Sequence, residues 1–408
     1  MSGRAPGPRQ PSAPDQPAPP VAADQPAWRR PVARPAIPRL PEEVGILLTY
    51  ACTARCRMCC FECGPDRKET MSLEEGLIFV RQAAEVPSVH TVVYSGGEPF
   101  LFPDLLLALT AEAAGLGLRV KVVTNAYWAT DTDTARRQLA PLVEAGLRVL
   151  EITADSFHQA HVPFDSVRTA LLAANEAGIE IHLATVVTRS SPKLADVLDR
   201  LGPAVRIDKR AELPCLPVGR AGVQVPREEL LLKEGWPEGR CDLLRIPAID
   251  PTGIAYACCG VAGFIPPLAL GRPLETPLAV LLERATDEPL VLALSLDGPG
   301  RLARHLTENG EARRVGTAFV HPCHLCHEVL ADPETAAILR DLLEPRRLFL
   351  MIERDIEVNK AEAAVGPEAE EGQSQATADG GESPITRMAR PHRPLPIPLP
   401  FRDDPGRR

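Results

Sequence analysis

The segment VGILLTYACTARCRMCC, residues 44–60, sets an apolar run directly before three cysteines, Cys52, Cys56 and Cys59. Residues 44–48 predict a buried strand, because a short apolar run of this kind fits a strand covered on both faces. The cysteines then lie in the loop at its carboxyl end. Three thiolates at spacings of four and three residues can bind three corners of an iron–sulfur cube, which leaves the fourth iron open. A zinc site or plain buried cysteines are the alternatives for this motif alone.

Downstream of this segment, strand-like runs alternate with amphipathic stretches. We expect strands at 44–48, 91–94, 119–123, 147–152, 180–187 and 204–207, and helices at 72–86, 103–114, 132–145, 164–177 and 192–201. Ser72, followed three residues later by Glu75, predicts a capping box at the first helix. Such alternation requires a parallel sheet covered by helices, an α/β fold that is either an open doubly wound sheet or an incomplete barrel. In both, ligands bind at the carboxyl ends of the strands.

The second predicted strand ends in YSGGEP, residues 94–99. Gly96 and Gly97 let a ligand approach the backbone closely, and Glu98 supplies a carboxylate for an ammonium group. In this order and in adjacent loops, CxxxCxxC and GGEP resemble the radical S-adenosylmethionine (radical SAM) superfamily. The resemblance covers about residues 44–210.

The resemblance implies a partial, TIM-like (β/α)6 barrel in which Cys52, Cys56 and Cys59 hold a [4Fe-4S] cluster. The open iron of that cluster would bind the amine and carboxylate of S-adenosylmethionine (SAM). One electron from the cluster then cleaves SAM to methionine and a 5′-deoxyadenosyl radical, which abstracts hydrogen from the substrate. An electron donor such as a flavodoxin or ferredoxin is implied as a partner.

Several other residues match positions where family members contact SAM. Gly96, Gly97 and Glu98 match contacts to the methionine amine. The positions matching polar contacts to the carboxylate and ribose are Thr124, Asn125, Thr153 and Asp155. The chain departs from the family at Met58, where an aromatic residue usually precedes the third cysteine. Methionine can still pack against adenine.

A second group of cysteines follows the predicted barrel. Between Cys241 and Cys258 stand eleven residues, Gly253 and four more residues. The flanking residues 246–249 and 254–256 predict a β-hairpin, which brings the two cysteines within reach of one cluster. Cys323 and Cys326 form a CxxC that can complete a four-cysteine site.

These four cysteines resemble the SPASM/Twitch auxiliary-cluster extension of radical SAM enzymes. A full SPASM domain has further cysteines after the CxxC, and none follows Cys326, so the resemblance implies one auxiliary [4Fe-4S] cluster. A structural zinc site on the same cysteines is the alternative, which His321, His324 and His327 keep open.

Other chemistry-bearing residues have two interpretations each. Cys60 and Cys63, beside the first motif, are expected to be spectators rather than ligands, and Cys259 has no assigned role. Cys215 stands between barrel and extension, where it could face the substrate cavity or complete the auxiliary site. His158 follows the fourth strand and could move a proton in the reaction or serve as a structural hydrogen-bonding residue.

Composition limits the class of protein. The 408 residues carry 45 Lys and Arg against 54 Asp and Glu, a net charge of −9, which argues against a general nucleic-acid binder. We find neither a signal-peptide-like stretch nor an apolar run of about 18 residues, so a cytoplasmic protein that does not span the membrane is expected. In such a reducing compartment, clustered cysteines bind metal more often than they form disulfides.

The chain is expected to divide into four parts. Residues 1–40, with eleven prolines, predict a disordered tail, and 361–408 predict a second one. The barrel is expected at 41–214 and the extension at 215–360, where 278–309 and 333–358 predict helices that form ordinary core.

The sequence therefore predicts a radical SAM enzyme acting on a peptide or protein, because enzymes with such extensions most often modify peptides. A dehydrogenase or epimerase of a sugar or aminocyclitol is the alternative. An iron–sulfur electron carrier or a zinc-stapled scaffold is the alternative of another class, and neither needs the GGEP turn. No segment predicts a peptide-recognition domain, so a separate recognition protein or the tails would recruit a ribosomal peptide.

Overall fold

The computed structural model describes residues 41–260 and 262–364. The tail predicted at 1–40 lies outside the described residues, as does most of the one predicted at 361–408; residues 361–364 instead end a helix. The described residues as far as Ala361 belong to one compact unit.

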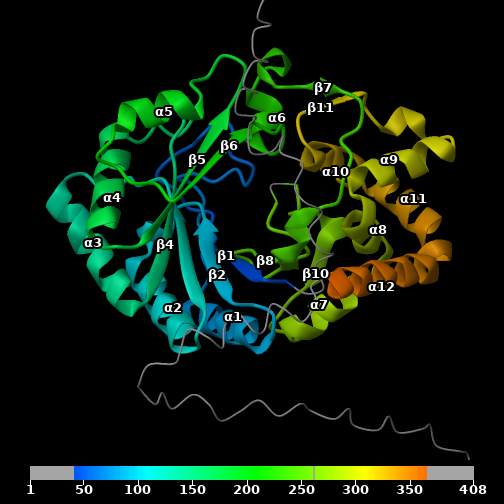
Figure 1. The fold of residues 1–408 in the computed structure, drawn as a ribbon, viewed down its shortest axis with the longest axis horizontal. Coiled ribbons are helices and arrows are strands. Elements are labelled where there is room, and N and C mark those ends of the chain that lie inside the picture. Colours follow the sequence, from blue (N-terminus) through cyan, green and yellow to red (C-terminus); the bar gives the residue numbers. More distant parts are fainter. Residues whose placement is uncertain (1–40, 261, 365–408) are drawn as a thin grey trace, which may run out of the picture. The chain divides into compact units, whose positions relative to one another are not determined.

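Within the described residues, nine strands form one sheet in the order β10-β9-β8-β1-β2-β3-β4-β5-β6. Its parallel part consists of β1 (Glu43–Thr49), β2 (Thr91–Gly96), β3 (Arg119–Thr124), β4 (Leu147–Thr153), β5 (Glu180–Val187) and β6 (Lys209–Pro214). The connecting helices are α1 (Leu73–Glu85), α2 (Pro103–Gly115), α3 (Thr132–Ala145), α4 (Phe164–Glu176) and α5 (Leu194–Leu201). These helices lie outside the curved sheet (Figure 1), and the strand order leaves β6 and β10 as edges. The expected α/β partial barrel is confirmed.

The core between sheet and helices explains why the strands read as apolar runs. In β1, every residue after Glu43 is buried, because helices cover one face and the barrel interior the other. Phe79 of α1 and Leu109 of α2 are fully buried in this core. Tyr94 is buried beside them and donates its hydroxyl to the Leu109 carbonyl at 2.7 Å. The predicted capping box is also present, with Ser72 and Glu75 each accepting from the other's backbone N–H.

The sixth strand was expected at 204–207, and this expectation is wrong. Those residues form a turn and loop, in which the apolar Val205 and Ile207 pack into the core without pairing. The strand is β6, whose sequence KRAELP is half-exposed and pairs only with β5. An edge strand at an open barrel margin lacks the apolar alternation that marks a covered strand.

The extension continues the barrel sheet through a hairpin. Its strands β8 (Ala248–Ile249) and β9 (Ala255–Tyr256) pair antiparallel, as predicted, and β8 pairs parallel with β1. The remaining strands are β10 (Ala269–Gly271), which pairs with β9, and β7 (Lys233–Glu234) and β11 (Ala318–Phe319), which pair with each other. The helices are α6 (Arg220–Gln224), α7 (Leu278–Thr286), α8 (Pro289–Asp297), α9 (Pro299–Glu308), α10 (Pro322–Leu330), α11 (Pro333–Leu343) and α12 (Arg347–Ala364).

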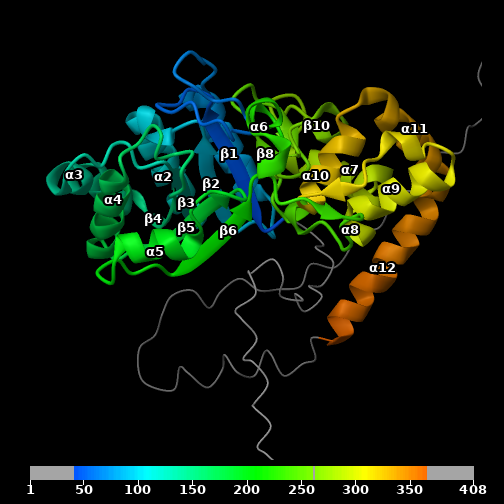
Figure 2. The same ribbon diagram turned by 90° about the horizontal axis from the view of Figure 1, so that it is seen from above.

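Helices α8 to α11 form a second core beside the sheet (Figure 2), with Leu290, Leu302, Leu325 and Leu339 fully buried. Short 3₁₀ turns stand at Pro99–Leu101, Arg227–Glu229, Asp242–Arg245, Pro266–Leu268, Ala312–Arg314 and Glu344–Arg346. The last of these breaks the helix predicted at 333–358, because Pro345 has no N–H to continue the helical hydrogen bonds. None of the described helices is both long and apolar enough to cross a membrane.

Candidate metal and cofactor site

Cys52, Cys56 and Cys59 lie on a loop that closes on itself. We call residues 51–64 the cluster loop. Ala51 and Gly64 pair as an isolated bridge at its base, and the Cys52 N–H donates to the Gly64 carbonyl at 3.1 Å. The cluster loop is thus anchored at the carboxyl end of β1, which holds its cysteines at the mouth of the barrel.

The cysteines line one cavity of about 160 Å³ with most of the residues predicted to contact SAM. From the cluster loop come Cys52, Cys56, Met58, Cys59, Cys60 and Cys63, and from the strand ends and following turns come Ser95, Gly96, Gly97, Thr124, Asn125, Thr153 and His158. The spacing of the two motifs predicted this convergence, since adjacent parallel strands end at one edge of the sheet.

Burial dominates the acidity of the thiols. It raises the pKa of Cys52 to about 11 and that of Cys56 further. The pKa of Cys59 is lowered to about 6, chiefly because the Cys63 thiol donates a hydrogen bond to it. On binding a cluster, Cys52 and Cys56 would release protons, and the bonds to iron would compensate the thiolate charge that burial disfavours. Several thiols on one cavity, beside backbone that a ligand can reach, fit an iron–sulfur cluster.

The two glycines of the GGEP turn are required by the backbone of the neighbouring segment. Gly96 has φ of +123°, and a Cβ there would lie 2.3 Å from the Thr49 carbonyl oxygen. A Cβ at Gly97 would lie 2.0 Å from the Ala51 carbonyl oxygen. Only glycine lets this turn pack against the base of the cluster loop while still lining the cavity.

Glu98 is fully buried and does not line the cavity. Its carboxylate accepts hydrogen bonds from the Thr124 hydroxyl at 2.8 Å, the Asn125 N–H at 2.9 Å and the Phe100 N–H at 3.1 Å. Burial raises the pKa of Glu98 to about 7. This geometry joins the ends of β2 and β3, and the contact of Glu98 with the SAM ammonium stays a prediction.

Asn125 connects the end of β3 to the cluster loop. Its side-chain amide donates to the Thr53 hydroxyl at 3.2 Å and contacts Cys52 Sγ at 3.7 Å. Glu98 and Asn125 thus connect two strand ends to the first cysteine.

Asp155 and His158 form a buried pair after β4. The Asp155 carboxylate accepts from His158 Nδ1 at 2.9 Å and from the backbone of Phe157, His158 and Val186, so its oxygens are engaged inside the loop. Burial opposes charge on His158, yet the Asp155 carboxylate raises the pKa of that imidazole above its usual value. Within the described part of the chain, His158 Nε2 makes no hydrogen bond. The ring is therefore oriented by Asp155 while it lines the cavity.

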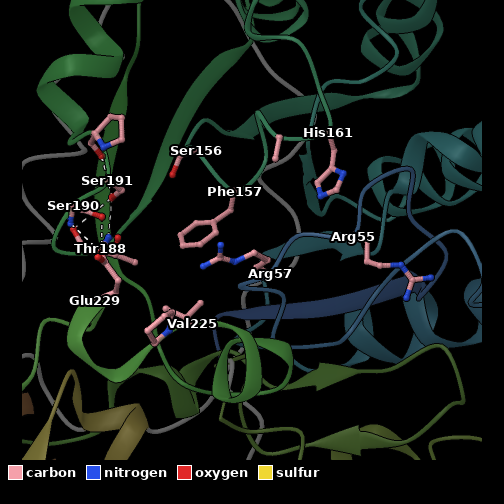
Figure 3. A pocket seen from close by; sticks show the side chains of 13 residues that line it. Arg55, Arg57, Ser156, Phe157, His161, Thr188, Ser190, Ser191, Val225 and Glu229 are labelled. Atoms are coloured by element: carbon pink, nitrogen blue, oxygen red, sulfur yellow. Dashed lines mark hydrogen bonds between the residues drawn. The ribbon is translucent and has the colours of Figure 1, made fainter.

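A larger cavity, of about 770 Å³, takes part of its wall from the same cluster loop (Figure 3). Arg55 and Arg57 line it, whereas the neighbouring Cys56 and Met58 line the cysteine cavity, so consecutive residues of the cluster loop serve the two cavities alternately. The other side chains around it are Ser156, Phe157, Ala160, His161, Thr188, Ser190, Ser191, Pro192, Val225, Pro226 and Glu229. These residues were not predicted as site residues from the sequence, since loop residues carry no periodic signal.

Cys215 is buried beside the same region. It packs in a small apolar cluster with Ala221 and Val225, and Met58 and Phe157 pack against that cluster. Burial raises the pKa of the Cys215 thiol to about 12. Cys215 packs beside residues of the larger cavity without lining it, and its role stays a prediction.

Cys241 directly precedes the 3₁₀ turn Asp242–Arg245, Cys258 follows β9, and Cys323 and Cys326 belong to α10. Burial is the first cause of the raised pKa of each thiol, and the charges of Cys241 and Cys326 raise that of Cys258 further. The sulfur atoms of Cys258 and Cys323 lie 3.5 and 3.8 Å from the position that a Cβ on Gly260 would take. The thiols of Cys258 and Cys323 therefore flank Gly260, and each of them interacts electrostatically with the thiol of Cys241.

The histidines near this set have backbone contacts. His321 Nδ1 accepts from the Cys323 N–H at 3.2 Å, and His324 Nδ1 accepts from the Val320 N–H at 3.2 Å. In the described residues, no three His, Cys, Asp or Glu side chains are arranged around the position of a single metal ion.

Comparisons with known proteins agree with these motifs. Residues 46–189, which include the cluster loop and the GGEP turn, match the family model of the radical SAM superfamily. YydG of Bacillus subtilis (strain 168), which is named as a peptide biosynthesis protein, is 22% identical over 299 residues, covering 71% of this chain and 92% of YydG.

Two further matches are shorter. The PqqA peptide cyclase of Methylorubrum populi is 27% identical over 178 residues, which are 40% of this chain and 44% of that protein. Among solved structures, Streptococcus suis SuiB bound to S-adenosylmethionine aligns with a TM-score of 0.41 and 15% identity, over 54% of this chain and 60% of SuiB.

Proposed function

We propose that this radical SAM enzyme, whose matched residues 46–189 hold both the cysteine loop and the glycine turn, abstracts hydrogen from a peptide or protein. The observation that carries this proposal is that the cluster loop lines two cavities, one lined by cysteines and one of about 770 Å³ that can admit a chain segment. In this proposal Cys52, Cys56 and Cys59 hold a [4Fe-4S] cluster. When bound, a reduced cluster and SAM supply a 5′-deoxyadenosyl radical, which takes a hydrogen atom from the substrate and becomes 5′-deoxyadenosine.

The residues of the cysteine cavity have distinct roles in this proposal. The backbone of Gly96 and Gly97 receives the methionine amine, and Thr124 and Asn125 face its carboxylate. Thr153 is left for the ribose and Met58 for the adenine, since both line the cavity. Glu98 positions Thr124 and Asn125 through its hydrogen bonds to them.

His158 and Cys215 are the candidates for handling hydrogen at the substrate. His158 presents an oriented ring to the cysteine cavity, because Asp155 fixes its Nδ1. Cys215 lies among residues that border the larger cavity, such as Phe157 and Val225. The superfamily match includes His158 but ends before Cys215.

A peptide substrate is favoured by the size of the larger cavity and by the relatives. YydG and the PqqA cyclase are both named for peptides. Arg57 contributes a guanidinium that, among the described residues, makes no hydrogen bond or ion pair, so a substrate carboxylate or backbone carbonyl can accept from it. A separate recognition protein and a flavodoxin or ferredoxin belong to the same proposal.

We further propose that Cys241, Cys258, Cys323 and Cys326 bind an auxiliary [4Fe-4S] cluster. The proximity of the Cys258 and Cys323 thiols at Gly260, and the electrostatic coupling of Cys258 with Cys241 and Cys326, support this assignment. His321 and His324 each accept a backbone N–H through Nδ1, which reduces the support for a zinc site with histidine ligands.

The substrate class can be tested without knowing the substrate. Reduced enzyme and SAM are incubated with fractions of an extract from source cells grown in deuterated medium, one holding peptides and proteins and one holding sugars and other small molecules. We expect deuterium in 5′-deoxyadenosine with the peptide fraction, and its loss after protease digestion of that fraction. Deuterium transfer from the small-molecule fraction alone would establish the sugar or aminocyclitol alternative instead.

A further inference from the structure

We infer that Arg220, which follows the barrel and lies outside both motifs, is a positioning residue for the cluster loop and an electrostatic partner of the cluster bound there. The inference rests on the proposed function in requiring a cluster at Cys52, Cys56 and Cys59. It assigns a specific task to the segment after β6, beyond the residues that match the superfamily model.

Arg220 makes three hydrogen bonds to carbonyl oxygens of the cluster loop. One guanidinium nitrogen donates to the Cys56 carbonyl at 2.7 Å and the other to the Cys63 carbonyl at 2.8 Å. The Arg220 backbone N–H donates to the Cys59 carbonyl at 3.1 Å. A planar guanidinium with two such bonds fixes both the distance and the orientation of the segments it joins. Two cysteine positions of the motif are therefore held from a segment more than 150 residues away in the chain.

The residue before it brings the backbone into close contact with the same loop. Gly219 has φ of +58°, and a Cβ at this position would lie 2.3 Å from the Cys60 carbonyl oxygen. The requirement for glycine shows that the two backbones meet without an intervening side chain. Gly219 and Arg220 together dock the start of α6 on the cluster loop.

The charge of Arg220 has no protein carboxylate to balance it. Arg220 is 7% exposed, and it forms no ion pair with any Asp or Glu of the described residues. Buried guanidinium groups are ordinarily paired with an anion. The groups that can carry negative charge beside it are the thiolates of the cluster loop, whose Cys56 and Cys63 carbonyls the guanidinium contacts.

A fixed positive charge at this place has a defined consequence for a cluster. Reduction adds negative charge, so a nearby cation favours the reduced form, and net charge and hydrogen bonding are known determinants of cluster potential. Arg220 should therefore make the cluster easier to reduce, and its two carbonyl bonds should slow the release of iron.

The test compares Arg220→Gln, Arg220→Lys and the control Arg168→Gln in the full-length, reconstituted enzyme. Arg168 of α4 likewise donates to a backbone carbonyl, that of Leu201, but in the outer helical layer. Two quantities are measured without turnover: the equilibrium constant for one-electron reduction, from an anaerobic spectroscopic titration, and the rate of iron release to a chelator. The spectroscopic signal of this cluster is identified as the one that is missing in the Cys56→Ala variant.

We expect Arg220→Gln to lower the reduction equilibrium constant about tenfold, which is about 59 mV for a one-electron couple, and to release iron several-fold faster. Arg220→Lys keeps the positive charge but loses the planar group that donates to two carbonyls. The cluster potential should therefore stay near that of the wild type, while iron release is still faster. Arg168→Gln should match the wild type in both measurements.

Unchanged potential and iron release in Arg220→Gln would overturn the inference. If that variant does not fold, Arg220→Lys decides alone, and wild-type iron release in it would overturn the positioning role. Wild-type protein that shows no signal dependent on Cys56 would contradict the proposed function itself, a separate outcome.

Discussion

The carboxylate of Glu98 accepts a hydrogen bond from the Asn125 N–H at 2.9 Å, and this bond joins the carboxyl end of β2 to that of β3. The same carboxylate accepts from the Thr124 hydroxyl, so one buried side chain orders two residues of the cavity wall. The acidic residue of the GGEP turn thus acts on the site through its neighbours.

Glu98→Ala should lower the free energy of unfolding, because it leaves three buried donors without an acceptor, at about 1–3 kcal/mol for each unsatisfied group. SAM binding should weaken as Thr124 and Asn125 lose their positions. Denaturant unfolding and equilibrium dialysis with SAM measure the two effects. A variant with wild-type stability and one to two decades weaker SAM binding would instead indicate the direct ammonium contact.

The pKa of Glu98 predicts a pH dependence of stability. Burial raises this pKa from 4.5 to about 7, so the folded chain binds the proton more tightly than the unfolded chain. The stabilisation is fully present below about pH 4.5 and is lost as the pH rises through about 7. The stability difference between wild type and Glu98→Gln, which stays neutral, should fall by up to about 1.4 kcal/mol per pH unit in this window. A difference that does not vary with pH would mean that Glu98 is ionised throughout.

Gly97→Ala and Gly115→Ala form a matched pair of glycine substitutions. A Cβ at Gly97 would lie 2.0 Å from the Ala51 carbonyl oxygen, whereas at Gly115 nothing lies within 4 Å. Gly97→Ala should cost about 1–3 kcal/mol or more through forced backbone movement, and Gly115→Ala should be neutral or stabilising by about 0.4–1 kcal/mol. Denaturant midpoints decide the comparison, and equal midpoints would contradict the close approach at Gly97.

Metal content distinguishes one cluster from two. Anaerobically reconstituted protein should hold about eight iron atoms per chain, four for each cube. Replacing Cys52, Cys56 and Cys59 together by alanine should leave about four, since the second set has its own four thiolates. Iron and zinc are measured by mass spectrometry. About one zinc with four irons would assign the second set to zinc and leave the first site intact.

Cleavage of SAM tests catalysis without the substrate. With dithionite under anaerobic conditions, the wild type should slowly form 5′-deoxyadenosine. Cys56→Ala should form none, because the cube loses one of its three thiolates. Cys323→Ala should retain cleavage, since Cys323 lies with the second set beside Gly260. Iron-loaded wild type that forms no 5′-deoxyadenosine would favour an electron carrier.

Local sequence determined the elements whose residues repeat with a regular period. The apolar run of β1 was predicted because both of its faces are buried, and the helices α1 to α5 because burial of one face leaves a period of 3.6 residues. The cysteine loop and GGEP turn could be brought together from sequence for a related reason: adjacent parallel strands end at the same edge.

The local pattern predicted the wrong segment as the sixth strand, because the buried segment there is not the one that pairs in the sheet. Val205 and Ile207 are buried in a loop, while the half-exposed β6 forms the last strand of the barrel. Edge strands pair on one side only, so their side chains need not alternate.

The tertiary structure alone decided the contacts between distant segments. Glu98 turns its carboxylate to the end of β3, Arg220 reaches the Cys56 carbonyl across 164 positions, and Cys258 meets Cys323 beside Gly260. A hydrogen bond to a backbone carbonyl depends on where the chain passes, not on which side chain that position carries, so it leaves no residue pattern to read. The sequence therefore predicted which side chains could bind a cluster. The tertiary structure decided which distant residues hold those side chains in place and which charges lie beside them.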